Sequence, residues 1–150
     1  MSFALIAILA AAAPVDCDRV QGAIARDECL LRESQEMSGF DCQDPQAQAQ
    51  LNVCSWRDYL RADIELNRSW SQLQAQYRES RPGVRVNPQS QFGMLLDAQR
   101  AWLSYRDKHC DGEAEGFAGG TMQPLIRNSC RTRITRNRTA ELKQIVEDRD

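Results

Sequence analysis

The sequence has little net charge and no surplus of basic residues. Its 150 residues include 19 Lys and Arg against 21 Asp and Glu, a formal charge of −2. General nucleic-acid-binding domains carry a basic surplus, so this class of protein is excluded. Hydrophobic residues make up 42% of the chain and charged residues 27%, a balance that argues against disorder. The composition predicts one folded, soluble domain.

Histidines and closely spaced cysteine pairs are also scarce, which removes most catalytic and metal-binding patterns. His109 is the only histidine, and the chain has no C-x-x-C pair. Adjacent residues on a helix, such as His109 and Cys110, point about 100° apart and do not form a catalytic pair. Asp63 and Glu65 are two positions apart and do not face each other either. We therefore predict no enzyme active site, no cofactor and no metal ion.

Long apolar runs are missing, apart from a short one at the N-terminus. Twelve of the residues from Met1 to Ala13 are apolar, and the run stops at Pro14 and Asp16, too early to span a bilayer. The small residues at its end suit a signal peptidase, although no Lys or Arg precedes the apolar core. We predict a signal peptide over residues 1–12; an apolar tail is the alternative. Because no lipid-attachment pattern surrounds Cys17, we expect a periplasmic or secreted protein without stable membrane insertion after cleavage.

Against these absences stand six cysteines, an even number that indicates disulfides in a small exported chain. Eleven residues separate the first two cysteines and also the next two, and nineteen separate the last two: Cys17, Cys29, Cys42, Cys54, Cys110 and Cys130. Fifteen pairings are possible, and the spacing does not choose among them. One uninterrupted helix over residues 17–29 would hold its ends about 18 Å apart, so a local bridge there requires a bend. Asp44 and Pro45 offer such a bend before Cys54, as a helix N-cap followed by proline at the first helical position.

Apolar residues recur at three- and four-residue steps through most of the chain, which predicts helices. The strongest stripe predicts a helix over residues 45–77, and it consists of Leu51, Cys54, Tyr59, Ala62, Leu66, Trp70, Leu73 and Tyr77. We predict further helices ending near Lys108, from Pro124 to Glu147, and over residues 17–37. Residues 79–90 and 111–121 are predicted as loops because they are rich in Pro, Asn or Gly. Almost no strand-like alternation is present, so the expected fold is all-α, a small disulfide-stapled bundle of about four helices.

Several strings in the middle of the chain carry a resemblance to a known family. They are FDC at 40–42, QAQLNVC at 48–54, YLRADIELN at 59–67, LLDAQRAWLSYRDKHC at 95–110, GG at 119–120, and Cys130 followed by Thr135, Arg138 and Leu142. Together they resemble the LprI-like family, bacterial envelope proteins named after a mycobacterial lysozyme inhibitor. The most specific piece is the A-Q-R-A-W-h-x-[FY]-R-D-x-x-C run, where h is apolar. The resemblance covers about two thirds of the chain.

The resemblance implies an organisation and a function. Together with the N-terminal apolar run, it predicts a signal peptide over residues 1–12, an N-terminal helical extension over 13–41 and an LprI-like helical domain over 42–147. The family's cysteine positions imply bridges between Cys42 and Cys54 and between Cys110 and Cys130, which leaves Cys17 and Cys29 to pair by elimination. The implied function is non-enzymatic inhibition of lysozyme by protein–protein binding. A general envelope scaffolding or stress-related binding module, without lysozyme activity, is the alternative.

Polar residues within the matching strings have two interpretations. They are Asp63, Asn67, Gln99, Arg100, Trp102 and Arg106. Asp63 and Asn67 lie one turn apart on one predicted helix, beside its apolar stripe, and Arg100 and Arg106 lie on another. If the two helices pack together, Asp63 can accept a hydrogen bond from one of these arginines and form an internal polar clamp. Alternatively, Trp102, Tyr105 and Arg106 form an exposed recognition surface, since these residue types dominate binding energy at interfaces.

Charged residues near the C-terminal half suggest two docking surfaces. Lysozymes are typically cationic, so the predicted loop from Asp111 to Thr121, with Glu113 and Glu115, is a candidate surface for binding one. Five arginines without an acid among them suit either a solvated face or an anionic polymer: Arg127, Arg131, Arg133, Arg136 and Arg138.

Overall fold

The computed structural model describes residues 16–39, 42–83 and 85–148, and within them the fold is all-α, as predicted. A short 3-10 helix, η1 (Cys17–Arg19), precedes α1 (Ala23–Ser38), α2 (Gln48–Ser80), α3 (Gln91–Glu115) and α4 (Gln123–Glu147). The predicted signal peptide, residues 1–12, lies outside the described residues. Among the described helices, none is both long enough and apolar enough to cross a bilayer.

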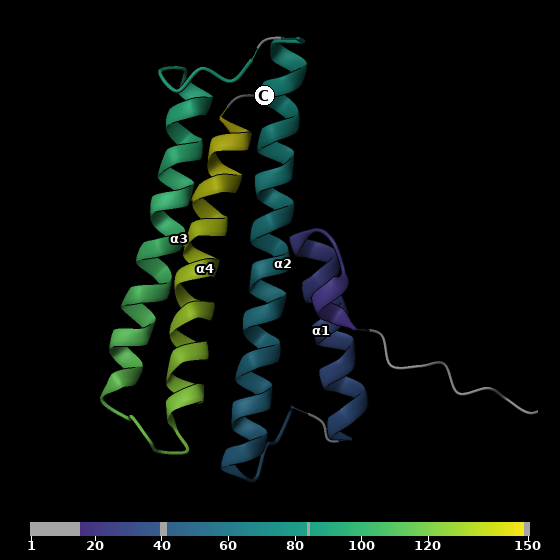
Figure 1. Ribbon diagram of the computed structural model, residues 1–150, viewed down its shortest axis with the longest axis vertical. Coiled ribbons are helices and arrows are strands. Elements are labelled where there is room, and N and C mark those ends of the chain that lie inside the picture. Colours follow the sequence, from purple (N-terminus) through teal and green to yellow (C-terminus); the bar gives the residue numbers. More distant parts are fainter. Residues whose placement is uncertain (1–15, 40–41, 84, 149–150) are drawn as a thin grey trace, which may run out of the picture.

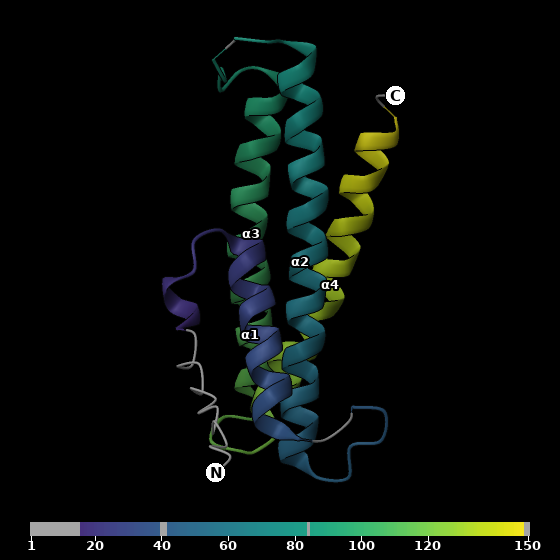
Figure 2. The ribbon, with the colours of Figure 1, turned by 90° about the vertical axis from the view of Figure 1, so that its right-hand side faces the viewer.

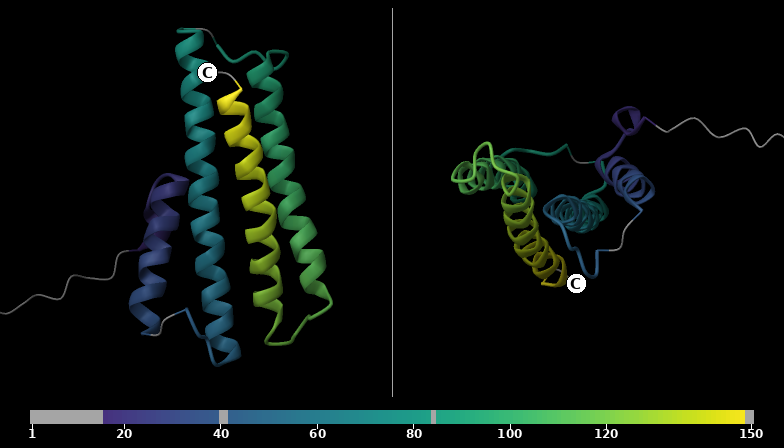
Figure 3. Two further views of the ribbon diagram at one scale, coloured as in Figure 1. Left: turned by 180° about the vertical axis from the view of Figure 1, so that it is seen from behind. Right: turned by 90° about the horizontal axis from the view of Figure 1, so that it is seen from below.

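The long helix α2 is the centre of the bundle. Its 33 residues span about 50 Å at 1.5 Å per residue. Helix α4 packs along α2, α3 packs against α4, and α1 packs against α2 on the other side (Figure 1). Seen after a 90° turn, α1 lies in front of α2, and α3 and α4 lie behind α2 (Figure 2). The view from below shows the same order, with α2 between α1 and α4 (Figure 3).

The core lies between the faces that α2, α3 and α4 turn toward one another. Leu66 and Leu73 of α2 and Leu142 of α4 form one fully buried cluster. Half-buried apolar side chains surround it: Trp70, Tyr77, Leu95, Trp102, Ile145 and Val146. A second cluster joins Ile134 to the disulfide between α3 and α4, and Trp102 packs against both clusters. The three-and-four spacing on α2 correctly identified the first cluster.

Helix α2 is buried on a second face that the apolar stripe did not predict. Leu60 and Ile64 are 1% and 5% exposed. They lie on α2 between Arg57, which donates to Ser34 of α1, and Arg68, whose partner is Glu28 of α1. This face is covered because α1 packs there, and only the packing of α1 turns it into a second core surface.

All three disulfides join the expected pairs, Cys17–Cys29, Cys42–Cys54 and Cys110–Cys130. The helical segment predicted over residues 17–37 is present in two pieces, η1 and α1, because the chain turns between them, with a left-handed φ of 90° at Gly22. This turn is the bend that a local bridge requires, and it brings the Cα atoms of Cys17 and Cys29 to 5.7 Å.

The predicted start of α2 at Pro45 is wrong. The helix begins at Gln48, and its N-cap is Ala47. The side chain of Gln50 accepts hydrogen bonds from the backbone N–H groups of Gln46 and Ala47, which the helix itself leaves unpaired. Cys42 still lies before the helix, so it is free to reach back to Cys54.

Candidate functional site

The buried guanidinium of Arg106 joins α3 to both neighbouring helices. Its Nη1 donates to Asp63 Oδ1 of α2 at 2.6 Å and reaches Thr135 Oγ1 of α4 at 3.5 Å, while its Nε donates to Asp107 at 3.0 Å. The Arg106 side chain is only 6% exposed. A buried charge of this kind needs several partners, and the three helices supply them. The geometry is that of an internal polar clamp, and Arg106 is not part of an exposed surface.

Two aromatic rings border the same guanidinium. Its central carbon lies 5.3 Å from the ring centroid of Trp102 and 5.4 Å from that of Tyr59, within range of cation–π attraction. Burial, and then the negative charge of Asp63, raise the pKa of Tyr59 to about 12. Burial alone would lower the pKa of Arg106, but Tyr59, Asp107 and Asp63 outweigh it and raise this pKa. Arg106 therefore stays charged and Tyr59 stays protonated at neutral pH.

The carboxylate of Asp63 also faces a second acid, Asp27 of α1. Asn67 donates to Asp63 Oδ2 at 3.0 Å, from one turn further along α2. Burial, and then the negative charge of Asp63, raise the pKa of Asp27 from 3.8 to about 7. One oxygen of Asp27, Oδ2, is buried without a hydrogen-bond partner among the described residues. The sequence analysis did not identify Asp27, because Asp27 lies outside the strings that resemble the family. Its neighbour Asp63 is on another helix, so no local spacing indicates that the two acids meet.

Two other predicted residues lie away from this cluster. Gln99 is buried and accepts from Nε of Arg138 on α4 at 3.0 Å, so it ties α3 to α4. Arg100 is 70% exposed, and its one ion pair among the described residues is with Asp97, one turn before it. The clamp consequently contains Asp63, Asn67 and Arg106, with Trp102 beside it, and excludes Arg100.

The connection between α3 and α4 is shorter than the loop predicted over residues 111–121. Residues 111–115 continue α3, and the loop comprises only residues 116–122. The Cys110–Cys130 disulfide holds the last turn of α3 to α4, and Ala114 is completely buried there. This packing outweighs the weak helix propensity of Gly112.

Ion pairs at this end of the bundle absorb most of the predicted charges. Asp111 accepts from Arg127 at 2.8 Å and from Arg131 at 3.3 Å, and Glu113 accepts from Arg133 at 2.8 Å. Arg138 pairs with Glu141 as well, so four of the five arginines predicted as a group are paired, whereas Arg136 is exposed and has no ion pair among the described residues. Glu115 is likewise exposed and has no ion pair among the described residues.

The shortened loop is closely tied to the helices. Phe117 and Ala118 donate their backbone N–H groups to the last turn of α3, both at 3.0 Å. Asn52 of α2 donates to the carbonyl oxygen of Thr121 at 2.9 Å, which anchors the loop to the centre of the bundle. Phe117 and Met122 nevertheless remain 40% and 42% exposed. The loop therefore presents two apolar side chains on an ordered backbone.

Comparison with known proteins places this arrangement in a family. Residues 41–142, two thirds of the chain, match the family described as Lysozyme inhibitor LprI. The chain belongs to the LprI family. The match contains Asp63, Arg106, the Cys110–Cys130 disulfide and the 116–122 loop, whereas Asp27 and the whole of α1 lie outside it.

Two curated relatives extend the comparison. The uncharacterized protein R02472 of Rhizobium meliloti (strain 1021) is 34% identical over 122 residues, which cover 79% of this chain and 88% of the relative. The uncharacterized protein YecT of Escherichia coli (strain K12) is 26% identical over 95 residues, 59% of each chain. No solved structure matches the chain significantly.

One group of potential metal ligands in this LprI-family chain fails as a metal site. Ligand atoms of His109, Glu113 and Cys130 lie within 4.8 Å of one another. Cys130 is bonded to Cys110, however, and has no thiolate to offer, while Glu113 already pairs with Arg133. The cluster is an ion-pair arrangement around the disulfide.

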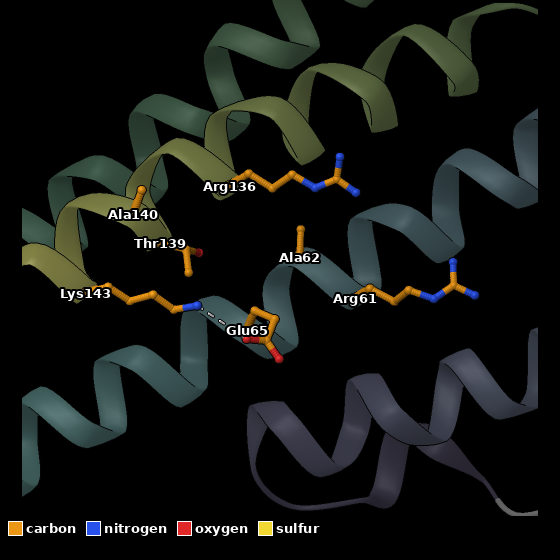
Figure 4. A pocket seen from close by; sticks show the side chains of 7 residues that line it. All are labelled: Arg61, Ala62, Glu65, Arg136, Thr139, Ala140 and Lys143. Atoms are coloured by element: carbon orange, nitrogen blue, oxygen red, sulfur yellow. Dashed lines mark ion pairs between the residues drawn. The ribbon is translucent and has the colours of Figure 1, made fainter.

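A pocket of about 350 Å³ lies between α2 and α4, still within the family match (Figure 4). Small side chains, Ala62, Thr139 and Ala140, line it between longer ones, and Lys143 reaches toward Glu65 across a 3.9 Å gap. Neither Asp63 nor Asp27 lines this pocket. Its charged side chains belong to solvent-exposed residues, so the pocket has the character of a surface groove.

Proposed function

We propose that this LprI-family protein is exported, has no enzymatic activity, and inhibits a lysozyme by binding it as a protein partner. Family membership over residues 41–142 supports the lysozyme partner. Three disulfides support an oxidising compartment outside the cytosol. Cleavage of the predicted signal peptide would remove residues 1–12. The mass of the mature chain isolated from its host therefore tests export directly.

The buried carboxylates support a role without catalysis. Glycosidases use two carboxyl groups that flank the substrate bond, one of them as a proton donor. Asp63 is only 16% exposed and is held by Arg106 and Asn67. Its neighbour Asp27 faces it from α1, so this carboxyl pair lies between helices and is engaged by other side chains of the bundle.

The loop over residues 116–122 is our proposed docking surface, and its anchoring is the observation that carries the proposal. The disulfide at its base and the hydrogen bond from Asn52 hold the loop before any partner binds. An ordered loop loses little conformational entropy on binding, which favours affinity. Phe117 and Met122 supply apolar anchors, and exposed Glu115 beside them suits a cationic enzyme. Inhibition would follow because the loop occludes the substrate cleft.

A lysozyme turnover assay with the purified, oxidised protein tests this function. We expect saturable inhibition, and Phe117→Ser should weaken it by about 2 kcal/mol, roughly thirtyfold in affinity. Met94→Ser is the matched control, because Met94 is 58% exposed near the other end of α3 and should leave inhibition unchanged. Equal effects of the two substitutions would remove the loop from the proposal.

The contribution of negative charge beside the loop is tested by substituting two glutamates at the end of α3 that differ in their surroundings. Glu115→Gln should weaken the complex more at low salt than at high salt, because it removes an exposed charge facing a cationic partner. Glu113→Gln should affect binding less, since Glu113 already pairs with His109 and Arg133. If no lysozyme is inhibited by a large molar excess of the protein, the scaffolding or stress-related binding module becomes the better explanation.

A further inference from the structure

A pocket of about 760 Å³ lies at the end of the bundle opposite the 116–122 loop, where α2 ends and α3 begins. In Figure 1 this is the upper end, whereas the 116–122 loop is at the bottom. The volume falls within the roughly 300–1,000 Å³ typical of small-molecule sites. Its position on the far end makes it independent of the proposed lysozyme-binding surface.

One wall of the pocket is a loop segment fixed tightly against α3. Ser90 caps the helix by accepting from the N–H of Gly93 at 3.0 Å, and its own hydroxyl donates to Asn87 O at 2.6 Å. A Cβ at Gly93 would collide with Asn87 O and lie 2.8 Å from Pro88 Cα. The loop approaches α3 this closely only because residue 93 has no side chain. The part of the wall from Asn87 to Ser90 is therefore held against α3.

Aromatic and aliphatic side chains form the apolar part of the pocket. The ring centroids of Tyr77 and Phe92 lie 4.8 Å apart, and the ring of Trp70 stacks on that of Phe92 at 6.0 Å. Leu96 and the 54%-exposed Val86 complete this lining. Such a surface favours an apolar group of a ligand over water.

Among the described residues, the charged side chains of the lining are all basic. Arg78, Arg81 and Arg85 line the pocket, and none of its lining residues is acidic. Within the described residues, none of these three arginines has an ion pair or side-chain hydrogen bond. Most arginines elsewhere do, as Arg68 does with Glu28 and Glu65. Three unpaired guanidinium groups beside an apolar wall complement an anion that carries an apolar group.

We propose that this pocket binds one molecule of a single-chain anionic amphiphile. Its carboxylate or phosphate head lies among Arg78, Arg81 and Arg85, and its chain packs on Tyr77, Phe92 and Leu96. Guanidinium groups bind such oxyanions with paired, charge-assisted hydrogen bonds. The mixture of unpaired cations and a compact apolar lining favours this ligand over a purely ionic one such as an acidic peptide.

Isothermal titration of the oxidised protein with dodecyl phosphate, kept below its micelle concentration, tests the proposal. We expect saturable binding with one molecule per chain, weakened by salt. Inorganic phosphate should bind at least tenfold more weakly because it lacks the chain. Dodecyl maltoside has the same chain without charge and should also bind at least tenfold more weakly. Comparable binding of the maltoside, or of a hexaglutamate peptide, overturns the proposal, as does no binding of dodecyl phosphate.

Substitutions locate the site without disturbing the core. Arg81→Gln and Arg85→Gln should each weaken binding about tenfold, the loss expected for one charge-assisted contact. Arg32→Gln is the matched control, because Arg32 is an exposed arginine on α1, away from the pocket, and should leave binding unchanged. Val86→Asp places a carboxylate in the pocket at an exposed position and should weaken binding more than either arginine variant. If the Arg32 variant behaves like the pocket variants, binding is nonspecific and the proposal fails. None of the four should alter lysozyme inhibition, so the two proposals are separable.

Discussion

Arg106 of α3 donates to Asp63 of α2 across 2.6 Å at the place where α4 also reaches the same guanidinium. Arg106→Met should destabilise the protein by about 3–5 kcal/mol, because Asp63 is left largely buried without its cation. Arg100→Met is the control, since the exposed pair of Arg100 with Asp97 contributes at most about 1 kcal/mol. Urea unfolding of both oxidised variants measures the difference, and equal stabilities would show that the clamp contributes nothing.

Asp27 should make stability fall as pH rises. Its pKa is about 7 in the folded protein against an ordinary value of 3.8, so the folded state keeps a proton that the unfolded state releases between these values. The stability from this proton is fully present below pH 3.8 and is lost as the pH rises through about 7. Asp27→Asn should remove this loss, so its stability relative to the parent protein should increase from about pH 4 to about pH 7 and then level off.

Thermal unfolding at a series of pH values measures that effect. Glu33→Gln is the control, because Glu33 is an exposed acid on the same helix. A parent protein and an Asp27→Asn variant with parallel stability profiles would show that Asp27 does not keep the proton in the folded state.

Loss of the Cys110–Cys130 bridge should destabilise the protein by about 3 kcal/mol, because the unfolded chain gains the freedom that a 20-residue separation had restricted. The double substitution to Ser should also loosen the 116–122 loop, which hydrogen exchange of the loop amides detects. Replacing Cys17 and Cys29 instead should increase exchange mainly in η1 and α1. Loop amides that remain equally protected without the Cys110–Cys130 bridge would contradict this assignment.

Two glycines on α3 should respond in opposite ways to alanine. Gly93→Ala should destabilise the protein by about 1–3 kcal/mol, because its Cβ collides with the backbone of Asn87 and Pro88. Gly112→Ala should stabilise it by about 0.5–1 kcal/mol, since Gly112 is helical and its Cβ would enter open space. Denaturant midpoints of the two variants test both signs, and a stabilising Gly93→Ala would show that the loop does not lie against α3.

The apolar spacing on α2 located the buried Leu66 and Leu73 because helical periodicity is a property of the local chain. It did not locate Leu60 and Ile64, whose burial depends on α1 packing against a second face. The loop predicted over residues 111–121 failed for a similar reason. The composition of that segment favours a loop, but the disulfide and the ion pairs of Asp111 and Glu113 extend the helix.

The sequence by itself determined the all-α class, the approximate positions of the helices and, through the family resemblance, the cysteine partners. Tertiary structure alone decided that Asp27 faces Asp63, that Arg100 stays outside the clamp, and that Arg78, Arg81 and Arg85 gather without a carboxylate. Helical periodicity and cysteine patterns depend on the spacing of residues along the chain, so the sequence contains them. The partner of a charged side chain, in contrast, depends on which helix faces meet in the folded molecule.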